Sequence, residues 1–154
     1  MSSDPLALPE VLLRSPPFLM IQILRAGRRA AETSPRGPQL GRICVVACLV
    51  EFGPQSQADI SRRLGWDPSD CVGIVDSLEA DGSVERRRDE SDRRRYALEL
   101  TAAGRRRFDE LAVDGQRHLT SFLGGLEPAE RDPFVDMLRR VLAHLDERVP
   151  PSPA

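Results

Sequence analysis

The chain has 154 residues, of which 40% are hydrophobic and 30% are charged, and its formal net charge is −2 at pH 7. This length fits one domain with its own core and short extensions, and it argues against two full domains. The sequence has no apolar run near the roughly 20 residues of a membrane span, and no basic start of a secretory signal. We therefore expect a cytoplasmic protein that crosses no membrane.

The distribution of charge matters more than its total, because domains that bind nucleic acid by bulk charge are commonly basic. All 22 cationic residues are arginines. Six of them lie between Arg86 and Arg95 with only three acids, so this segment has a local net charge of +3. This cluster indicates an anionic partner, and the predicted elements show how it is presented.

Proline and glycine divide the first part of the chain. A Pro-Pro pair at 16–17 can open a helix but cannot continue one, so a long helix is predicted at 18–33, after a short apolar arm at 6–13. The breaker-rich stretch 34–38 predicts a loop. Residues 40–52 are apolar nearly all round, which is typical of a buried central helix.

Two short helices follow, each with a start signal. Ser56 can cap the first, with Asp59 reaching back, and Gly65 closes it. Asp67 followed by proline starts the second. Four apolar residues of this second helix fall at i, i+3, i+4 and i+7 and predict one stripe that faces a core: Cys71, Ile74, Val75 and Leu78.

The arginine cluster lies at the turn of a predicted hairpin. Gly82 is placed where a helix commonly ends in a left-handed residue, and strand 83–88 follows it. The return strand alternates Tyr96, Leu98 and Leu100 on one face. A hairpin with cations at its tip, directly after a helix pair, has the shape and charge to hold a duplex through its phosphates and minor groove.

Thr101 can cap a long helix that ends near Gly124. A last helix starts either at Pro128 or at Pro133 with Asp132 as its cap, and the sequence leaves both starts open. Residues 148–154 are predicted to be a disordered tail.

This order of elements resembles the multiple antibiotic resistance regulator (MarR) family of winged-helix transcription factors over about residues 16–147. The residues that match the family's wing signature are Leu78 to Gly82, Val84, Arg86, Asp89, Asp92, Arg93, Arg94, Leu98, Leu100, Thr101 and Gly104. The resemblance implies a mainly α fold with a small β-hairpin wing, in which a winged helix-turn-helix domain sits on a helical dimerisation base. The implied parts are an N-terminal arm at 1–15, a dimerisation region at 16–38 and 102–147, and a DNA-binding domain at 39–101.

The function implied by the resemblance is a homodimeric DNA-binding regulator with no catalytic activity and no cofactor. We expect a repressor that a small molecule releases from palindromic operator DNA. The second short helix would be the reading helix, Arg94 would enter the minor groove, and Asp92 would hold the wing arginines in place. Electrostatics supports these roles, because an arginine at a hairpin tip suits a narrow electronegative groove. A nearby carboxylate can fix the orientation of its guanidinium group by bidentate pairing.

Residues expected at the interface with double-stranded DNA lie on the two short helices and the wing. They are Ser56, Gln57, Arg62, Arg63, Ser69, Asp70, Gly73, Arg86, Arg88, Arg93, Arg94 and Arg95. The resemblance also implies an effector pocket. An apolar lining that suits a hydrophobic or aromatic ligand would come from Leu24, Ile43, Ala47 and Phe108.

The reading helix departs from the family pattern. No cation lies between residues 65 and 85, and Val72 and Gly73 stand where relatives often place a serine or threonine and a basic residue. We therefore expect binding to depend on the wing and on Arg62 and Arg63, with modest sequence specificity.

Other assignments stay open on the sequence alone. Arg86 and Arg88 share a strand face and either pair with Asp89 or Asp92 or contact phosphate directly. Asp70 either accepts a hydrogen bond from a cytosine amine or repels phosphate.

Cys44, Cys48 and Cys71 form an odd set without a close pair, which argues against disulfides and a zinc site. We expect all three to pack as small hydrophobic residues, although the spacing of Cys44 and Cys48 also permits a redox sensor. His118 and His144 are too isolated to indicate a metal site.

Two other functions compete with the regulator hypothesis. The acidic reading helix and negative net charge would also suit a winged-helix module that binds a protein and has lost most of its DNA binding. An enzyme is disfavoured, because no nucleophile has a histidine near it in the sequence.

Overall fold

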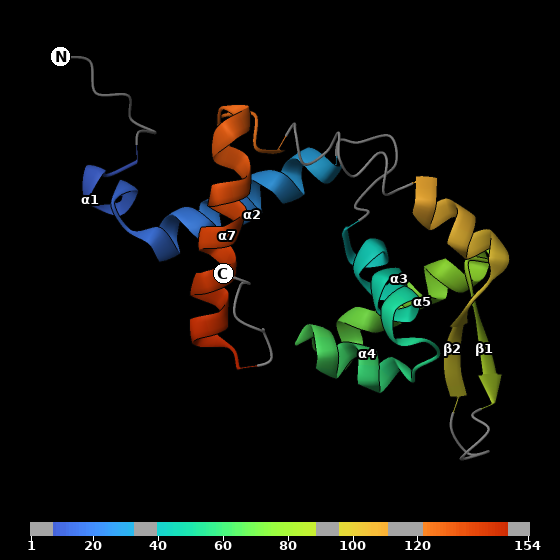
Figure 1. The fold of residues 1–154 in the computed structure, drawn as a ribbon. Coiled ribbons are helices and arrows are strands. Elements are labelled where there is room, and N and C mark those ends of the chain that lie inside the picture. The colour runs from blue at the N-terminus through green and yellow to red at the C-terminus, as the bar shows by residue number, and fades with distance from the viewer. Residues whose placement is uncertain (1–7, 33–39, 89–95, 111–121, 148–154) are drawn as a thin grey trace. The chain divides into compact units, whose positions relative to one another are not determined.

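The computed structural model describes residues 8–32, 40–88, 96–110 and 122–147. Its elements, shown in Figure 1, are α1 (Glu10–Leu13), α2 (Pro16–Glu32), α3 (Leu40–Phe52), α4 (Gln57–Leu64), α5 (Pro68–Ala80), β1 (Val84–Arg88), β2 (Tyr96–Leu100) and α7 (Pro128–Leu145). Residues 102–110 are also helical. The chain divides into two compact units, 1–111 and 112–154. The predicted fold class, mainly α with one small hairpin, is confirmed.

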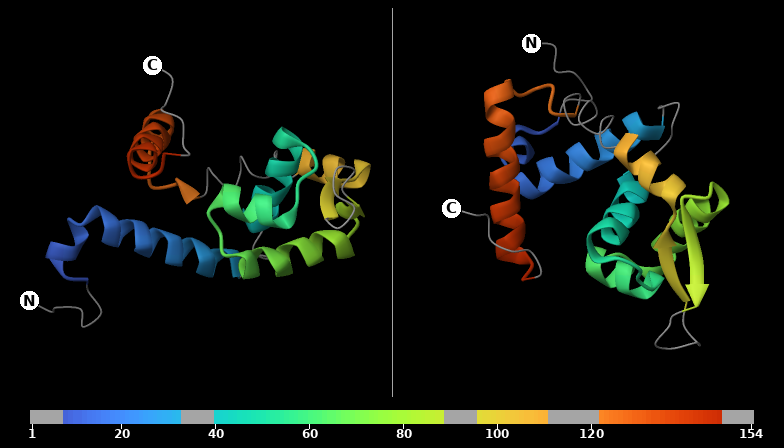
Figure 2. Two further views of the ribbon diagram at one scale, coloured as in Figure 1. Left: turned by 90° about the horizontal axis from the view of Figure 1, so that it is seen from below. Right: turned by 45° about the vertical axis from the view of Figure 1, so that its right-hand side comes forward.

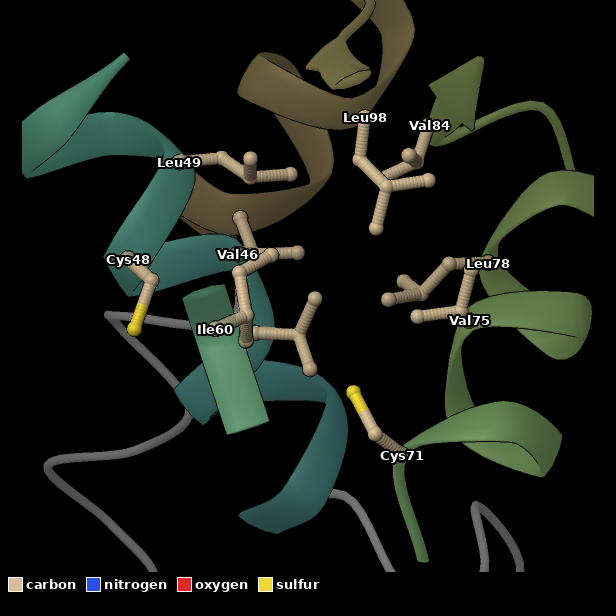
Figure 3. Close-up of a cluster of buried hydrophobic side chains, with 10 residues drawn as sticks. Val46, Cys48, Leu49, Ile60, Cys71, Val75, Leu78, Val84 and Leu98 are labelled. Atoms are coloured by element: carbon tan, nitrogen blue, oxygen red, sulfur yellow. The ribbon is translucent and has the colours of Figure 1, made fainter. Parts of the chain in front are cut away.

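The winged lobe, which we define as residues 40–110, has one hydrophobic core. Figure 3 shows side chains from α3, α4, α5 and the hairpin converging on it. The fully buried members include Val45 and Ile60, and Leu98 closes the core from the hairpin side. Within the predicted stripe of α5, Ile74 is half-buried and the other three residues are buried. The helical periodicity therefore identified the inner face of α5 correctly.

Strands β1 and β2 pair antiparallel beside α5, and Figure 2 shows this hairpin from two further directions. The register places Val84 opposite Leu100, Arg86 opposite Leu98 and Arg88 opposite Tyr96. Leu98 also exchanges backbone hydrogen bonds with the segment before α4: Gln55 N–H donates to the Leu98 carbonyl at 3.3 Å, and Leu98 N–H donates back at 2.8 Å. The hairpin is thus anchored on both sides at its base.

Along the hairpin face that begins at Val84, burial falls toward the tip. Val84 and Leu98 are buried and Leu100 is half-buried, as the predicted alternation requires. Tyr96 is 54% exposed, because it lies beyond the core at the far end of β2. The same face therefore holds the core at the base of the wing and presents polar groups nearer its tip.

The junction between α5, the hairpin and the helix at 102–110 is tight. Gly82 adopts the predicted left-handed conformation, with φ +73°. Thr101 caps the following helix as predicted, because its hydroxyl oxygen accepts from Gly104 N–H at 3.0 Å. A Cβ on Gly104 would lie 2.0 Å from the Ser83 carbonyl oxygen, so only glycine fits there.

Several boundaries differ from the predictions. The apolar arm contains the short helix α1, and α2 begins at Pro16 rather than at residue 18. Strand β1 begins one residue later than predicted, because Ser83 N–H donates to the Leu78 carbonyl and completes the end of α5. Of the two open starts for the last helix, the structure has Pro128. Glu127 N–H donates to Glu130 Oε2 at 2.9 Å and stabilises this start, and Pro133 lies inside the helix.

The predicted loop at 34–38, the predicted wing tip at 89–95, residues 111–121 of the predicted long helix and the predicted tail lie outside the described residues. Among the helices that the structure describes, none is long and apolar enough to cross a membrane.

Candidate nucleic-acid interface

Helix α4 is held by its predicted cap. Ser56 Oγ accepts from Asp59 N–H at 3.2 Å and donates to the Asp59 carboxylate at 2.6 Å. Arg62 and Arg63, expected to contact DNA, are exposed at the other end of the helix. Arg62 pairs with Asp59 at 2.8 Å, so part of its charge is already neutralised within the helix.

Arg63 is positioned by α3. Its guanidinium carbon lies 3.7 Å from the centroid of the Phe52 ring, and its Nε donates to Gln55 Oε1 at 3.2 Å. A cation over an aromatic face is attracted to the ring and keeps its charge. Arg63 is therefore a fixed cation at the junction of α3 and α4.

The N-terminus of α5 carries its own anion. Asp67 accepts from Ser69 N–H at 2.9 Å and from Ser69 Oγ at 2.6 Å. These two hydrogen bonds from Ser69 lower the pKa of Asp67. A helix N-terminus commonly binds phosphate, but here a side-chain carboxylate occupies one of its N–H groups. The expected DNA contact Ser69 thus also donates to the cap of α5, and Asp67 places a negative charge at the start of this helix.

The outer face of α5 is exposed as predicted, from Asp70 through Val72 and Gly73 to Asp76. Val72 is 44% exposed, and a Cβ added to Gly73 would meet nothing within 4 Å. This face is therefore small and shallow enough for a close approach to a groove. Its charge is negative.

Several ion pairs lie at the base of the wing. Arg87 bridges Glu85 at 2.6 Å and Glu99 at 3.2 Å, two acids that lie directly opposite each other across the hairpin. Arg86 pairs with α5, as described below. Of the three wing arginines that the structure describes, Arg88 alone has no acidic partner. The remaining expected wing residues, Asp92, Arg93, Arg94 and Arg95, lie outside the described residues.

Asp81, at the end of α5, is a hub that sequence reasoning missed. Arg42 of α3 pairs with its carboxylate and donates to Ser77 Oγ at 2.8 Å, while Arg107 Nη1 approaches Asp81 Oδ1 to 3.0 Å. Partial burial by itself raises the pKa of Asp81, but hydrogen bonds from Ser83 and Arg42 outweigh it and hold the pKa below its usual value. The C-terminal end of α5 is thereby fixed to two neighbouring helices.

The cysteines fit a packing role. Cys48 and Cys71 are buried, Cys44 is half-buried, and all three are free thiols. Burial raises the pKa of the Cys44 and Cys48 thiols, which disfavours the reactive thiolate. Within the described part of the chain, no group of three His, Cys, Asp or Glu side chains is arranged to hold a metal ion.

The expected effector residues occupy different settings. Phe108 packs against the core of the winged lobe, and Ile43 and Ala47 of α3 are half-buried. Leu24, on α2, is 60% exposed. The pocket stays a prediction.

A helix pair followed by an arginine-bearing hairpin defines a winged-helix DNA-binding protein. The model of the MarR family matches residues 40–96, which run from α3 to the start of β2. The HTH-type transcriptional repressor NicR of Pseudomonas putida KT2440 is 31% identical over 107 residues, 68% of either protein. The chain therefore belongs to the MarR family of transcriptional regulators.

Solved structures agree with this assignment. The PcaV transcriptional regulator of Streptomyces coelicolor, crystallised with its natural ligand, is 28% identical with a TM-score of 0.72, over 91% of this chain and 99% of PcaV. CouR of Rhodococcus jostii RHA1, bound to p-coumaroyl-CoA, is 27% identical with a TM-score of 0.63, over 86% of this chain and 95% of CouR. NicR is thus a transcriptional repressor and PcaV a transcriptional regulator.

Proposed function

We propose that this chain is a cytoplasmic homodimeric repressor that binds palindromic operator DNA through its winged lobes. The observation that carries the proposal is the wing: a hairpin with six arginines between Arg86 and Arg95, anchored at its base to α5 and to Gln55. The proposed contacts are the residues predicted from the sequence other than Arg86, which pairs with acids of α5, and most of the attraction comes from the wing. Electrostatic contacts of this kind dominate binding to a duplex.

The dimer is supported by apolar surface on two helices outside the winged lobe. On α7, Leu138, Val141, Leu142 and Leu145 are between 39% and 75% exposed and follow helical spacing. Helix α2 likewise exposes Leu19, Met20, Ile23 and Leu24. Contiguous apolar surface of this kind marks an interaction site. We infer that residues 16–38 and 102–147 form the helical dimerisation region and that the winged domain occupies residues 39–101.

The dimer is tested by Leu142→Glu. A single chain has a mass of 17.1 kDa, so light scattering should give about twice that value for the unaltered protein and the single-chain value for the variant. Arg140→Glu, an exposed position nearly opposite Leu142 on α7, is the matched control and should stay dimeric. An unaltered chain that is monomeric at micromolar concentration would contradict the proposal.

DNA binding is tested by selecting bound duplexes from genomic fragments and titrating the best one against salt. The affinity should fall steeply with salt, because several phosphates are neutralised. The rival function, a winged-helix module that binds a protein, is favoured by the acidic face of α5 and by the ion-paired arginines. An absence of binding even at low salt would favour that rival.

The effector is proposed to be a small apolar or aromatic molecule, since Ile43, Ala47, Phe108 and Leu24 offer apolar side chains. PcaV and CouR, both more than a quarter identical, were crystallised with ligands. The molecule bound to CouR, p-coumaroyl-CoA, is a suitable first probe. Release of the selected duplex at saturating probe would support an effector response, and unchanged affinity would exclude this compound.

A further inference from the structure

Arg86 of β1 reaches across to the reading helix and binds two acids there. Its Nη2 lies 3.1 Å from Asp76 Oδ1, and its Nε lies 3.2 Å from Glu79 Oε2. Asp76 and Glu79 are three residues apart and therefore neighbours on the surface of α5. One planar guanidinium thus spans both carboxylates with two different nitrogens, a geometry that a lysine cannot reproduce.

The position of Arg86 follows from the register. Val84 is the buried residue at the start of this strand face, and Arg86 is the next residue on the same face, opposite buried Leu98. The face that holds the core at the base of the hairpin therefore delivers Arg86 to the side of α5. Arg88, two residues further along, lies opposite exposed Tyr96 and has no acidic partner in the described part of the chain.

The negative charge of α5 explains why a cationic partner such as Arg86 matters. Residues 66–84 contain five acids and no cation, although this segment includes the helix proposed to enter a DNA groove. Asp76 and the start of α5 are exposed, so their carboxylates would face phosphates without compensation. Arg86 is the cation that the fold brings to Asp76 and Glu79 from outside the helix.

We propose that Arg86 is a positioning residue that serves α5 rather than DNA: it neutralises Asp76 and Glu79, ties the base of the wing to the reading helix, and contacts no phosphate. This inference rests on the proposed DNA-binding function. The inference assigns different tasks to two arginines of β1: Arg86 pairs with the acids of α5, and Arg88 contacts phosphate. It also settles the choice left open for Arg86 in favour of an acidic partner, on α5 rather than in the turn.

The first test compares conservative variants, Arg86→Lys and Arg88→Lys, for affinity toward a mixed-sequence duplex at low salt. Lysine keeps a phosphate contact as a point charge but cannot bridge two carboxylates. Arg86→Lys should therefore weaken binding about fivefold, while Arg88→Lys should stay within about twofold of the unaltered chain. Thermal unfolding of each variant confirms that the lobe is folded at the assay temperature.

The second test is a double-mutant cycle in which Arg86→Gln is combined with Asp76→Asn and Glu79→Gln. If Arg86 stays on its acids in the complex, removing the acids should change affinity less than about threefold when Arg86 is present. Removing them should raise affinity about tenfold when Gln replaces Arg86, because the uncovered carboxylates are then gone. Arg88→Gln, the matched control, should lose the same factor with and without the acids.

If Arg86→Gln lowers DNA affinity by the same factor with and without Asp76→Asn and Glu79→Gln, Arg86 contacts phosphate directly and the inference is overturned. Binding by Arg86→Lys that matches the unaltered chain would overturn it as well. In both cases the unaltered protein still binds duplex, so the proposed function stands. If the unaltered chain binds no duplex at low salt, the proposed function fails and this inference fails with it.

Discussion

The reading helix and the wing, neighbours in the same lobe, carry opposite charge. Helix α5 and its flanks hold five acids without a cation, whereas the segment from Arg86 to Arg95 has a net charge of +3. At the base of the wing much of that positive charge is already paired, through Arg86 to α5 and through Arg87 to Glu85 and Glu99. On this difference we propose a division of labour, in which α5 supplies a small shape that fits a groove and the outer part of the wing supplies the attraction to phosphate.

Two glycines give the same contrast in packing. Gly104, beneath the wing, has the Ser83 carbonyl oxygen 2.0 Å from where its Cβ would be. Gly73, on the outer face of α5, has nothing within 4 Å. The anchor of the wing is thus closed to any side chain, while the reading face is open to one.

The largest expected effect comes from Gly104→Ala. The added methyl must displace the backbone at Ser83, so we expect a loss of about 1–3 kcal/mol in the free energy of unfolding together with strongly reduced DNA binding. Chemical denaturation measures the first and a mobility-shift titration the second. Gly73→Ala is the control and should raise stability by about 0.5–1 kcal/mol, since alanine is the better helix former. Equal stability of the Gly104→Ala variant and the unaltered chain would refute the close approach.

An intermediate effect is expected from Gly73→Arg, which adds a cation to the face of α5 that has none. In a dimer two cations are added, so affinity for a mixed-sequence duplex should rise about tenfold and its dependence on log salt should steepen by about two units. Gly73→Ala again controls for helix stability. Unchanged affinity would mean that this face of α5 does not approach DNA.

The smallest effect is expected from Asp81→Asn. About a third of the Asp81 side chain is exposed, so solvent screening limits its pairing with Arg42 and Arg107 to about 1 kcal/mol or less. Because folding lowers the pKa of Asp81, its stabilisation is present above the unfolded pKa and is lost as the pH falls through the folded pKa. The unfolding temperatures of variant and unaltered chain should therefore differ at pH 7 and converge below about pH 4. A constant difference across this range would exclude the carboxylate as its cause.

Local signals predicted most of the winged lobe. The cap at Ser56, the stripe from Cys71 to Leu78, the left-handed Gly82 and the cap at Thr101 depend on residues within about one or two turns of each other, and all are confirmed. The start of α7 was left open because Pro128 and Pro133 both suit a first turn, and the side chain of Glu130 favours the former.

Long-range ion pairs could not be predicted in the same way. Arg42 and Asp81 are 39 residues apart, and no local pattern joins them. The pairing of Arg86 was partly predictable, because the alternation from buried Val84 gives the strand face on which Arg86 lies. The sequence does not show that this face packs against α5, so the acidic partners could not be named. The roles of residues 89–95 are still a prediction from the sequence and the family.

The central claim, that the wing and not α5 supplies the attraction to DNA, is tested most directly by the salt dependence of a variant carrying Arg88→Gln and Arg94→Gln. A dimer with two wings would lose four cations at the DNA, two at phosphates and two in the minor groove, so the slope of log affinity against log salt should become shallower by about four units. Arg139→Gln on α7 should leave the slope unchanged. A doubly substituted wing with the slope and affinity of the unaltered protein would contradict the account.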